Sequence, residues 1–133
     1  MVSACNIEQA ILDKWGEIKT SHARWMVLTC EGNDVKLESS GGLDTDFEAF
    51  KSALPADDAR FGVFNLMWDS DDGRKMSKLL FITYVPDTCK VMAVKFTYAQ
   101  NKDKVAGTFQ PINKALQIND RLDLNETEWR EMF

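Results

Sequence analysis

Two apolar runs separated by a short polar segment constrain the fold of this chain more than any other feature. Residues 61–68 and 76–85 are mostly apolar, and the segment 69–73 between them is rich in turn-forming residues. A strand with one wet face alternates apolar and polar residues, whereas a strand covered on both faces does not. The two runs are therefore predicted to be neighbouring strands at the centre of a sheet, with helices on both sides.

The other segments supply helices and further strands. Residues 6–19 place apolar side chains at spacings of three and four, which is typical of an amphipathic helix. The further expected elements are a hairpin at 25–30 and 35–38, a short helix at 47–54 before Pro55, a long helix at 86–106, a strand at 114–118 and a helix at 126–133. This order predicts an α/β fold of the α+β type: one domain over residues 1–133, with a mixed five-stranded sheet sandwiched between helices.

Composition sets the class of protein. A chain of 133 residues, with 44% apolar and 28% charged residues, is typical of one soluble globular domain. No apolar run approaches the about 18 residues needed to cross a bilayer. The first six residues already include the polar Ser3 and Asn6, so the start lacks the apolar stretch of a secretory signal. We therefore expect a cytoplasmic protein. Its three cysteines are expected to be free thiols, with a redox or disulfide role as the alternative.

Charge is unevenly distributed along the chain. The net charge of −5 argues against general nucleic-acid binding, for which a basic face is expected. Between Asp72 and Lys104, however, seven basic residues outnumber three acidic ones. This region is a candidate docking face for a negatively charged partner. The alternative is an ordinary solvated charged face.

The chain offers few residues for catalysis. His22 is the only histidine and lies in a polar stretch between a helix and a strand, where a surface position is expected. The acidic residues of segment 69–73 lack the distal glutamate of a calcium loop and are expected to form a solvated turn. No glycine-rich loop carries a lysine for nucleotide phosphates. We expect no enzyme, no catalytic residue, no metal and no cofactor.

Five segments, residues 47–55, 57–64, 77–88, 98–103 and 117–120, carry recognisable patterns in a fixed order along nearly the whole chain. They are similar to a helix ending in Leu-Pro and to the patterns DDCRYAVYD, SKLxFIxWxPDT, YASSKD and QATD of the actin-depolymerising factor/cofilin family. The chain thus resembles an ADF-homology domain. The resemblance implies that family's mixed five-stranded sheet packed between helices.

The resemblance also implies a function. Family members bind actin monomers and filaments, generally favour ADP-actin, and promote filament depolymerisation and severing. The long helix and the N-terminal segment enter the cleft between two actin subdomains, while the strand hairpin and the C-terminal helix touch the neighbouring protomer. Phosphoinositides, or phosphorylation of a serine near the N-terminus, block the activity. We therefore expect a monomeric protein of the actin cytoskeleton.

Carried over residue by residue, the resemblance implies two sets of contacts. The monomer-binding residues are Ser3, Ala4, Met92, Lys95, Lys102 and Asp103, with Ser3 as the regulatory phosphosite. The filament-binding residues are Lys75, Met76, Lys78, Glu131 and Met132.

The chain departs from the family pattern at several positions. Six residues separate Val91 from Tyr98, where the family has five, so one cation of the monomer-binding pair is missing and a π-bulge is the expected accommodation. Met76 and Met132 stand where basic residues are usual, and the sequence ends at Phe133 before a further expected arginine. These changes predict weakened severing. The alternative function is an interaction module that binds an actin-related protein complex without actin turnover activity, as glia maturation factor-like members do.

Overall fold

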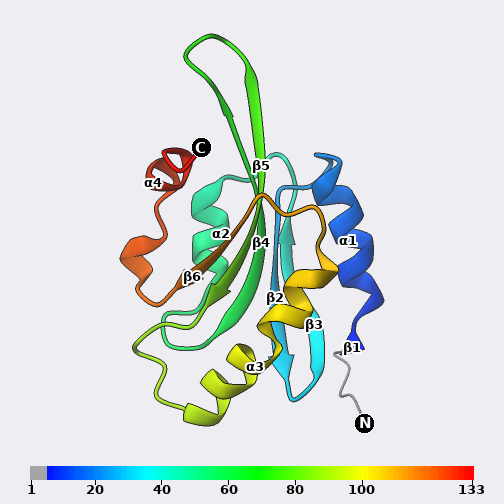
Figure 1. Cartoon of the computed structure of the whole chain (residues 1–133), viewed down its shortest axis with the longest axis vertical. Helices are drawn as coiled ribbons and strands as arrows, with labels where there is room; N and C mark the ends of the chain where they lie inside the picture. Colours follow the sequence, from blue (N-terminus) through cyan, green and yellow to red (C-terminus); the bar gives the residue numbers. More distant parts are fainter. Residues whose placement is uncertain (1–5) are drawn as a thin grey trace.

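One mixed sheet organises the molecule. The computed structural model describes residues 6–133, and its sheet has the strand order β1-β3-β2-β4-β5-β6 (Figure 1). The strands are β1 (Asn6–Ile7), β2 (Trp25–Glu31), β3 (Asp34–Gly41), β4 (Arg60–Asp69), β5 (Lys75–Tyr84) and β6 (Lys114–Ile118). The helices are α1 (Gln9–Lys19), α2 (Phe47–Ala53), α3 (Met92–Thr108) and α4 (Glu126–Arg130), with a 3-10 turn η1 (Arg121–Asp123). The two edge strands pair in parallel and the inner strands pair antiparallel, which confirms the predicted mixed sheet.

The sheet has one short edge strand more than the five predicted. Residues 6–7 were assigned to the first helix, but Asn6 donates its backbone N–H to Asn33 O at 2.7 Å and pairs in parallel with β3. Glu8 also donates to Val35 O, at 3.1 Å, so α1 begins only at Gln9. Two residues are too few for any alternation of apolar and polar side chains to reveal a strand.

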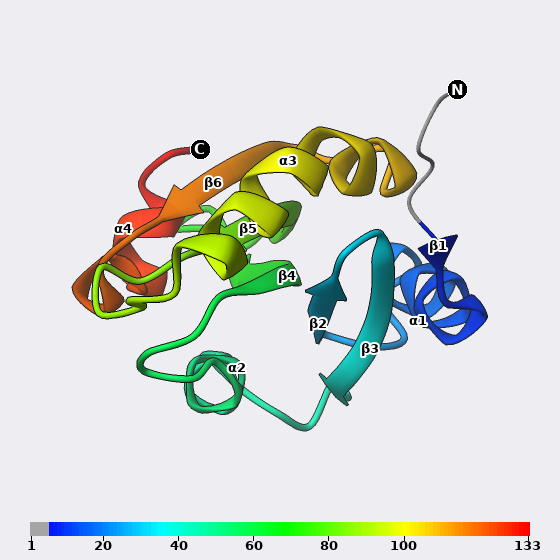
Figure 2. The same ribbon diagram turned by 90° about the horizontal axis from the view of Figure 1, so that it is seen from below.

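Helices cover both faces of the sheet, as the two apolar runs predicted. Figure 2 shows α1 and α3 on one side of the strands and α2 and α4 on the other. Phe61, Val63 and Phe81 point into the core under α1 and α3, whereas Phe64 and Leu80 point into the core under α2 and α4. Because alternate side chains of the same strand enter different cores, the central strands need apolar residues on both faces.

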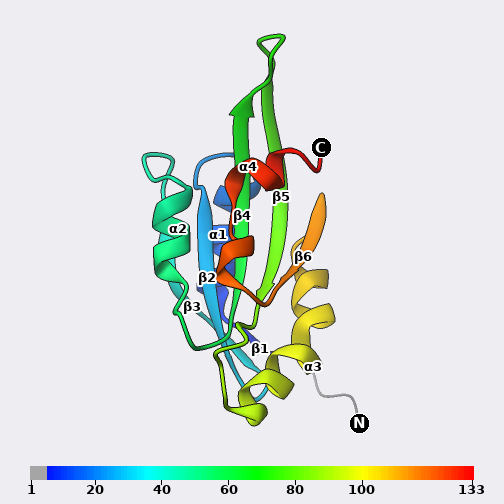
Figure 3. The same cartoon turned by 90° about the vertical axis from the view of Figure 1, so that its left-hand side faces the viewer.

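The β4–β5 hairpin extends past the helices. Figures 1 and 3 show its tip projecting beyond the rest of the molecule, at the opposite end from α3. The predicted turn is confirmed: Ser70 donates its backbone N–H to Arg74 O at 2.8 Å, and Gly73 has a φ of 84°, which suits a residue without a side chain. The outer part of this hairpin therefore lies outside both cores.

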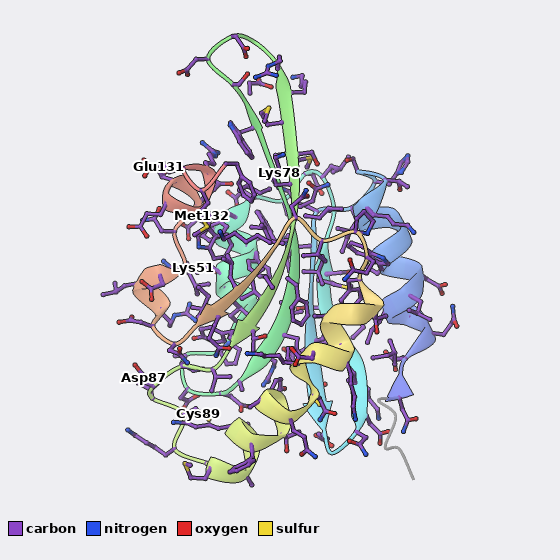
Figure 4. All side chains as sticks on the ribbon, in the orientation of Figure 1. Lys51, Lys78, Asp87, Cys89, Glu131 and Met132 are labelled. Atoms are coloured by element: carbon purple, nitrogen blue, oxygen red, sulfur yellow. The ribbon has the colours of Figure 1, made fainter. Side chains whose placement is uncertain are left out.

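The long helix starts later than predicted. Residues 86–91 are not helical, because Asp87 donates its N–H to Asn119 O at 2.8 Å and the Thr88 hydroxyl donates to Ala56 O at 2.6 Å. Cys89 is buried in this segment, which Figure 4 shows leading into α3. The helix then runs past Gly107 to Thr108. All of Met92–Thr108 lies within the described residues and is α-helical, so the expected π-bulge is absent there.

Candidate binding surfaces

Two buried polar side chains fix the position of α3. The Tyr98 hydroxyl accepts a hydrogen bond from Cys30 N at 2.9 Å, and Asn101 Nδ2 donates to Gly32 O at 2.9 Å. Both side chains are almost fully buried against the turn that joins β2 to β3. Buried polar groups of this kind are costly unless paired, so these contacts hold the helix at one depth and one rotation.

The rotation of α3 decides which residues it presents. An α-helix turns by about 100° per residue, because it has about 3.6 residues per turn. The face turned away from Tyr98 and Asn101 carries Met92, Phe96 and Asp103, and Lys95 and Lys102 follow along one flank. Met92 is 65% exposed and Phe96 is 70% exposed. We call Met92, Lys95, Phe96, Lys102 and Asp103 the first surface.

The structure thus brings together four of the six residues predicted for monomer binding. Ser3 and Ala4, including the predicted phosphosite, lie outside the described residues. Lys102 and Asp103 also line a small hollow of about 120 Å³ between α3 and β6. Phe96 was missed by the sequence analysis, although its spacing of four from Met92 could have indicated a shared face. Because Met92 and Phe96 are both large and exposed and lie on one face, together they are a candidate contact for a partner.

The predicted filament-binding residues also gather in one region, on the outer part of the hairpin and the segment after α4. Figure 4 shows Glu131 and Met132 beside the base of the hairpin, at the level of Lys78. The Phe133 ring connects the two segments, because its centroid lies 6.3 Å from that of Trp68 and 5.5 Å from Lys78 Nζ. We call Lys75, Met76, Lys78, Glu131 and Met132 the second surface.

Acidic neighbours offset much of the positive charge on the hairpin. Lys75 Nζ lies 3.1 Å from Asp69 Oδ1, and Arg74 Nε lies 2.9 Å from Asp72 Oδ2. A hydrogen bond from the Ser70 hydroxyl, together with the Arg74 guanidinium, holds the pKa of the Asp72 carboxyl below its usual value. Exposed pairs like these add little to stability, because water and salt screen them. They do, however, reduce the net field that a partner meets at the hairpin tip.

Charged and aromatic contacts hold α4 against the sheet. Glu126 lies 3.6 Å from Arg24 Nη2 and 3.2 Å from Arg130 Nη2, so one carboxylate bridges a residue before β2 and the end of α4. Trp129 is 1% exposed, and its indole N–H donates to Asp123 O at 3.0 Å. These contacts therefore fix the position from which Glu131 and Met132 of the second surface extend.

The remaining chemically interesting residues form no shared site. His22 is exposed, and its Nδ1 lies 2.8 Å from the Thr20 hydroxyl. The Cys30 and Cys89 side chains are buried, whereas Cys5 lies outside the described residues. Over residues 6–133, no three side chains of the types that bind metals are grouped as a metal site would require. Within the same residues, no helix is long and apolar enough to span a membrane.

Comparison with known proteins identifies the family. A model of the cofilin/tropomyosin-type actin-binding proteins matches residues 4–133, and the chain belongs to this family. The chain is 28% identical to actin-depolymerizing factor 7 of Arabidopsis thaliana over 92% of its own length and 90% of the relative's. It is 27% identical to actophorin of Acanthamoeba castellanii, over 94% and 91% of the two lengths.

Solved structures confirm the fold. The crystal structure of Streptomyces griseoflavus cofilin superposes with a TM-score of 0.85 at 22% identity, covering 95% of this chain and 94% of that one. Coactosin from Entamoeba histolytica superposes with a TM-score of 0.82 at 18% identity, covering 98% and 94%. The fold is thus common to relatives that carry different names, and it does not by itself select one activity.

Proposed function

We propose that this protein binds actin monomers through the first surface, contacts a neighbouring filament protomer through the second, and promotes filament depolymerisation and turnover. The observation that carries the proposal is the placement of the two surfaces. The helix of the first surface and the hairpin of the second lie at opposite ends of one continuous sheet (Figure 3). A rigid molecule with two separated contact surfaces can hold two protomers at once. The names of the relatives, which are actin-depolymerizing factors, support this proposal.

The first surface suits a partner with an apolar cleft and an acidic rim. Burying one large apolar side chain contributes roughly 1.5–3 kcal/mol, so Met92 and Phe96 can supply much of the affinity for a monomer. Lys95 and Lys102 on the adjacent flank favour a negatively charged rim. In this chain the apolar contact compensates for the cation that the family pattern has and this helix lacks.

The second surface is proposed to be the weaker one. Met76 and Met132 provide no charge where basic residues are usual, and Asp69 already pairs with Lys75. Binding at the filament should therefore be weakened more than binding to the monomer, with severing weaker than depolymerisation. A preference for ADP-actin, inhibition by phosphoinositides, control through phosphorylation of Ser3 and a cytoplasmic location belong to the same proposal.

Two binding assays on the purified chain test the proposal. Native gels with ADP-actin monomers should show a stable complex, and co-sedimentation should show binding to filaments. The rate of filament loss after dilution should rise with protein concentration. A chain that bound neither monomers nor filaments would contradict the proposal and would favour the interaction-module alternative.

A further inference from the structure

One aromatic side chain joins the two parts of the second surface. Phe133 contacts the Trp68 ring, with centroids 6.3 Å apart, and lies under the Lys78 ammonium, 5.5 Å from ring centroid to Nζ. Trp68 belongs to β4 and Lys78 to β5, whereas Phe133 follows α4. Three separate segments of the chain therefore meet at this point.

The register of the hairpin explains why this contact is possible. Trp68 lies directly opposite Met76, and Leu66 lies directly opposite Lys78. Trp68 and Lys78 are thus diagonal neighbours on the same face of the hairpin, within reach of one large side chain. Leu66 belongs to the core that also contains Trp129 of α4, so this is the face next to the C-terminal segment.

The contact changes what Lys78 can do. A cation within about 6 Å of an aromatic ring centroid is attracted to the face of the ring. A lysine held in this way has lost part of its rotamer freedom before a partner arrives, which lowers the cost of binding. The neighbouring cations of the hairpin tip differ, because Arg74 and Lys75 pair with carboxylates of the hairpin itself.

We propose that Phe133 is a positioning residue for the second surface: it holds the Lys78 ammonium in place for an acidic group on the filament. The proposal rests on the proposed function and deepens it, because it assigns filament contact to a unit of Lys78, Trp68 and Phe133. Phe133 then matters for filaments and not for monomers, since the first surface lies at the other end of the molecule.

The contact itself is tested without actin. In NMR spectra of the full chain, the side-chain methylene protons of Lys78 should be shifted upfield by the Phe133 ring. Phe133→Leu keeps an apolar group against Trp68 but should remove this shift, whereas Phe133→Tyr should keep it. The matched replacement Phe96→Leu, on α3, should leave the Lys78 resonances unchanged. Resonances of Lys78 that did not respond to Phe133→Leu would overturn the proposal.

The role is tested with filaments and a double-mutant cycle. Phe133→Leu should weaken filament binding by about two- to fivefold, the effect expected of one partly exposed cation–aromatic contact. Phe133→Tyr should restore it, and monomer binding should not change. In a Lys78→Gln background, Phe133→Leu should have no further effect, because the residue acts through the lysine. Additive losses would overturn the proposal. A parent chain that failed to bind filaments would refute the proposed function, while the NMR result would still decide whether the contact exists.

Discussion

At the scale of single residues, Gly62 is a position in the centre of the sheet where packing leaves no room for a side chain. It lies in β4 between β2 and β5, opposite Val27 and Ile82. A Cβ atom at this position would lie 2.8 Å from Phe50 Cζ of α2. The Phe50 ring therefore occupies the space that a methyl group at residue 62 would need.

Gly62→Ala should therefore destabilise the protein. The central strand is hydrogen bonded on both sides and cannot move away, so the Phe50 ring must shift, at a cost of roughly 1–3 kcal/mol. Urea unfolding measures the change. Phe50→Leu should recover part of the loss in the Gly62→Ala background, although it is itself destabilising in the parent. Equal stability of Gly62→Ala and the parent would show that the ring moves freely.

Tyr98 predicts a dependence of stability on alkaline pH. Burial raises the pKa of its hydroxyl to about 12, above the value of about 10 in an unfolded chain. The folded state thus favours the protonated phenol; this stabilisation is complete below about pH 10 and is lost as the pH rises towards 12. Tyr98→Phe should cost about 1–3 kcal/mol at neutral pH, because the N–H of Cys30 loses its partner. The difference in free energy of unfolding between parent and variant should shrink from about pH 10 to 12 in urea titrations; a constant difference would contradict the assignment.

Local signals in the sequence predict the structural roles of some residues, such as helix caps, but not the roles of residues with distant partners. Asparagine is a favoured helix N-cap, so Asn125 is a signal for the start of the last helix, and its side chain accepts a hydrogen bond from Glu128 N at 3.1 Å. Before α2, the sequence favours Asp44 or Thr45 as the cap, but the structure uses Asp46. Neighbouring side-chain acceptors in one loop are equivalent until the backbone direction is known. The roles of Tyr98 and Asn101 could not be predicted, because their partners lie about seventy residues earlier in the chain.

At the scale of elements, α3 shows how a helix can be recognised while its start is misplaced. The motif that includes Lys102 and Asp103 predicted the helix and most of the first surface. The residue at which α3 begins depends instead on Asp87 and Thr88. Their hydrogen bonds to Asn119 and Ala56 hold residues 86–91 out of the helix. Contacts to such distant segments leave no trace in local periodicity.

The mixed character of α3 predicts two kinds of salt dependence. Lys95→Glu should weaken monomer binding by about 1–3 kcal/mol, through loss of a charge-assisted contact, and the effect should shrink in high salt. Phe96→Ala should weaken binding by a similar amount at every salt concentration, because it removes apolar area. Calorimetric titration of actin monomers at two ionic strengths separates the two.

Lys19→Glu provides the control for this experiment, since it reverses an exposed charge at the end of α1, away from the first surface. Its monomer affinity should match that of the parent. An effect of Lys95→Glu no larger than that of Lys19→Glu would remove Lys95 from the binding surface.

At the scale of the whole molecule, the two apolar runs correctly placed β4 and β5 at the centre of a covered sheet. The meeting of the hairpin with the segment after α4 was beyond the reach of sequence patterns, because it depends on Phe133 crossing to residues more than fifty positions earlier. The resemblance supplied both halves of the second surface. The side chain that links them emerged only in three dimensions.

Restoring charge to the second surface should strengthen it. Met76→Arg with Met132→Arg adds two cations to the second surface, and a cation in an exposed ion pair is worth about 0.2–1 kcal/mol. Filament affinity should therefore rise by about 2- to 30-fold, with more frequent severing in single-filament imaging and little change in monomer binding.

A control must separate this local effect from the general attraction between a more basic protein and an acidic filament. Leu43→Arg with Leu122→Arg adds the same charge at two other exposed apolar positions. It should raise severing much less. Frequent severing by the parent at sub-micromolar concentration, or an equal gain in the control, would contradict a deficit located at Met76 and Met132.

The projection of the hairpin beyond both cores also affects how this protein can change over generations. Residues 69–76 bury little apolar surface, so replacements there cost little folding free energy and seldom bring the chain to its stability threshold. Selection on the hairpin tip then acts almost entirely on partner binding. On α3, by contrast, a change near Tyr98 or Asn101 alters folding and binding together. Under the proposed function, filament contact is therefore the property that this architecture leaves most free to drift or to adapt.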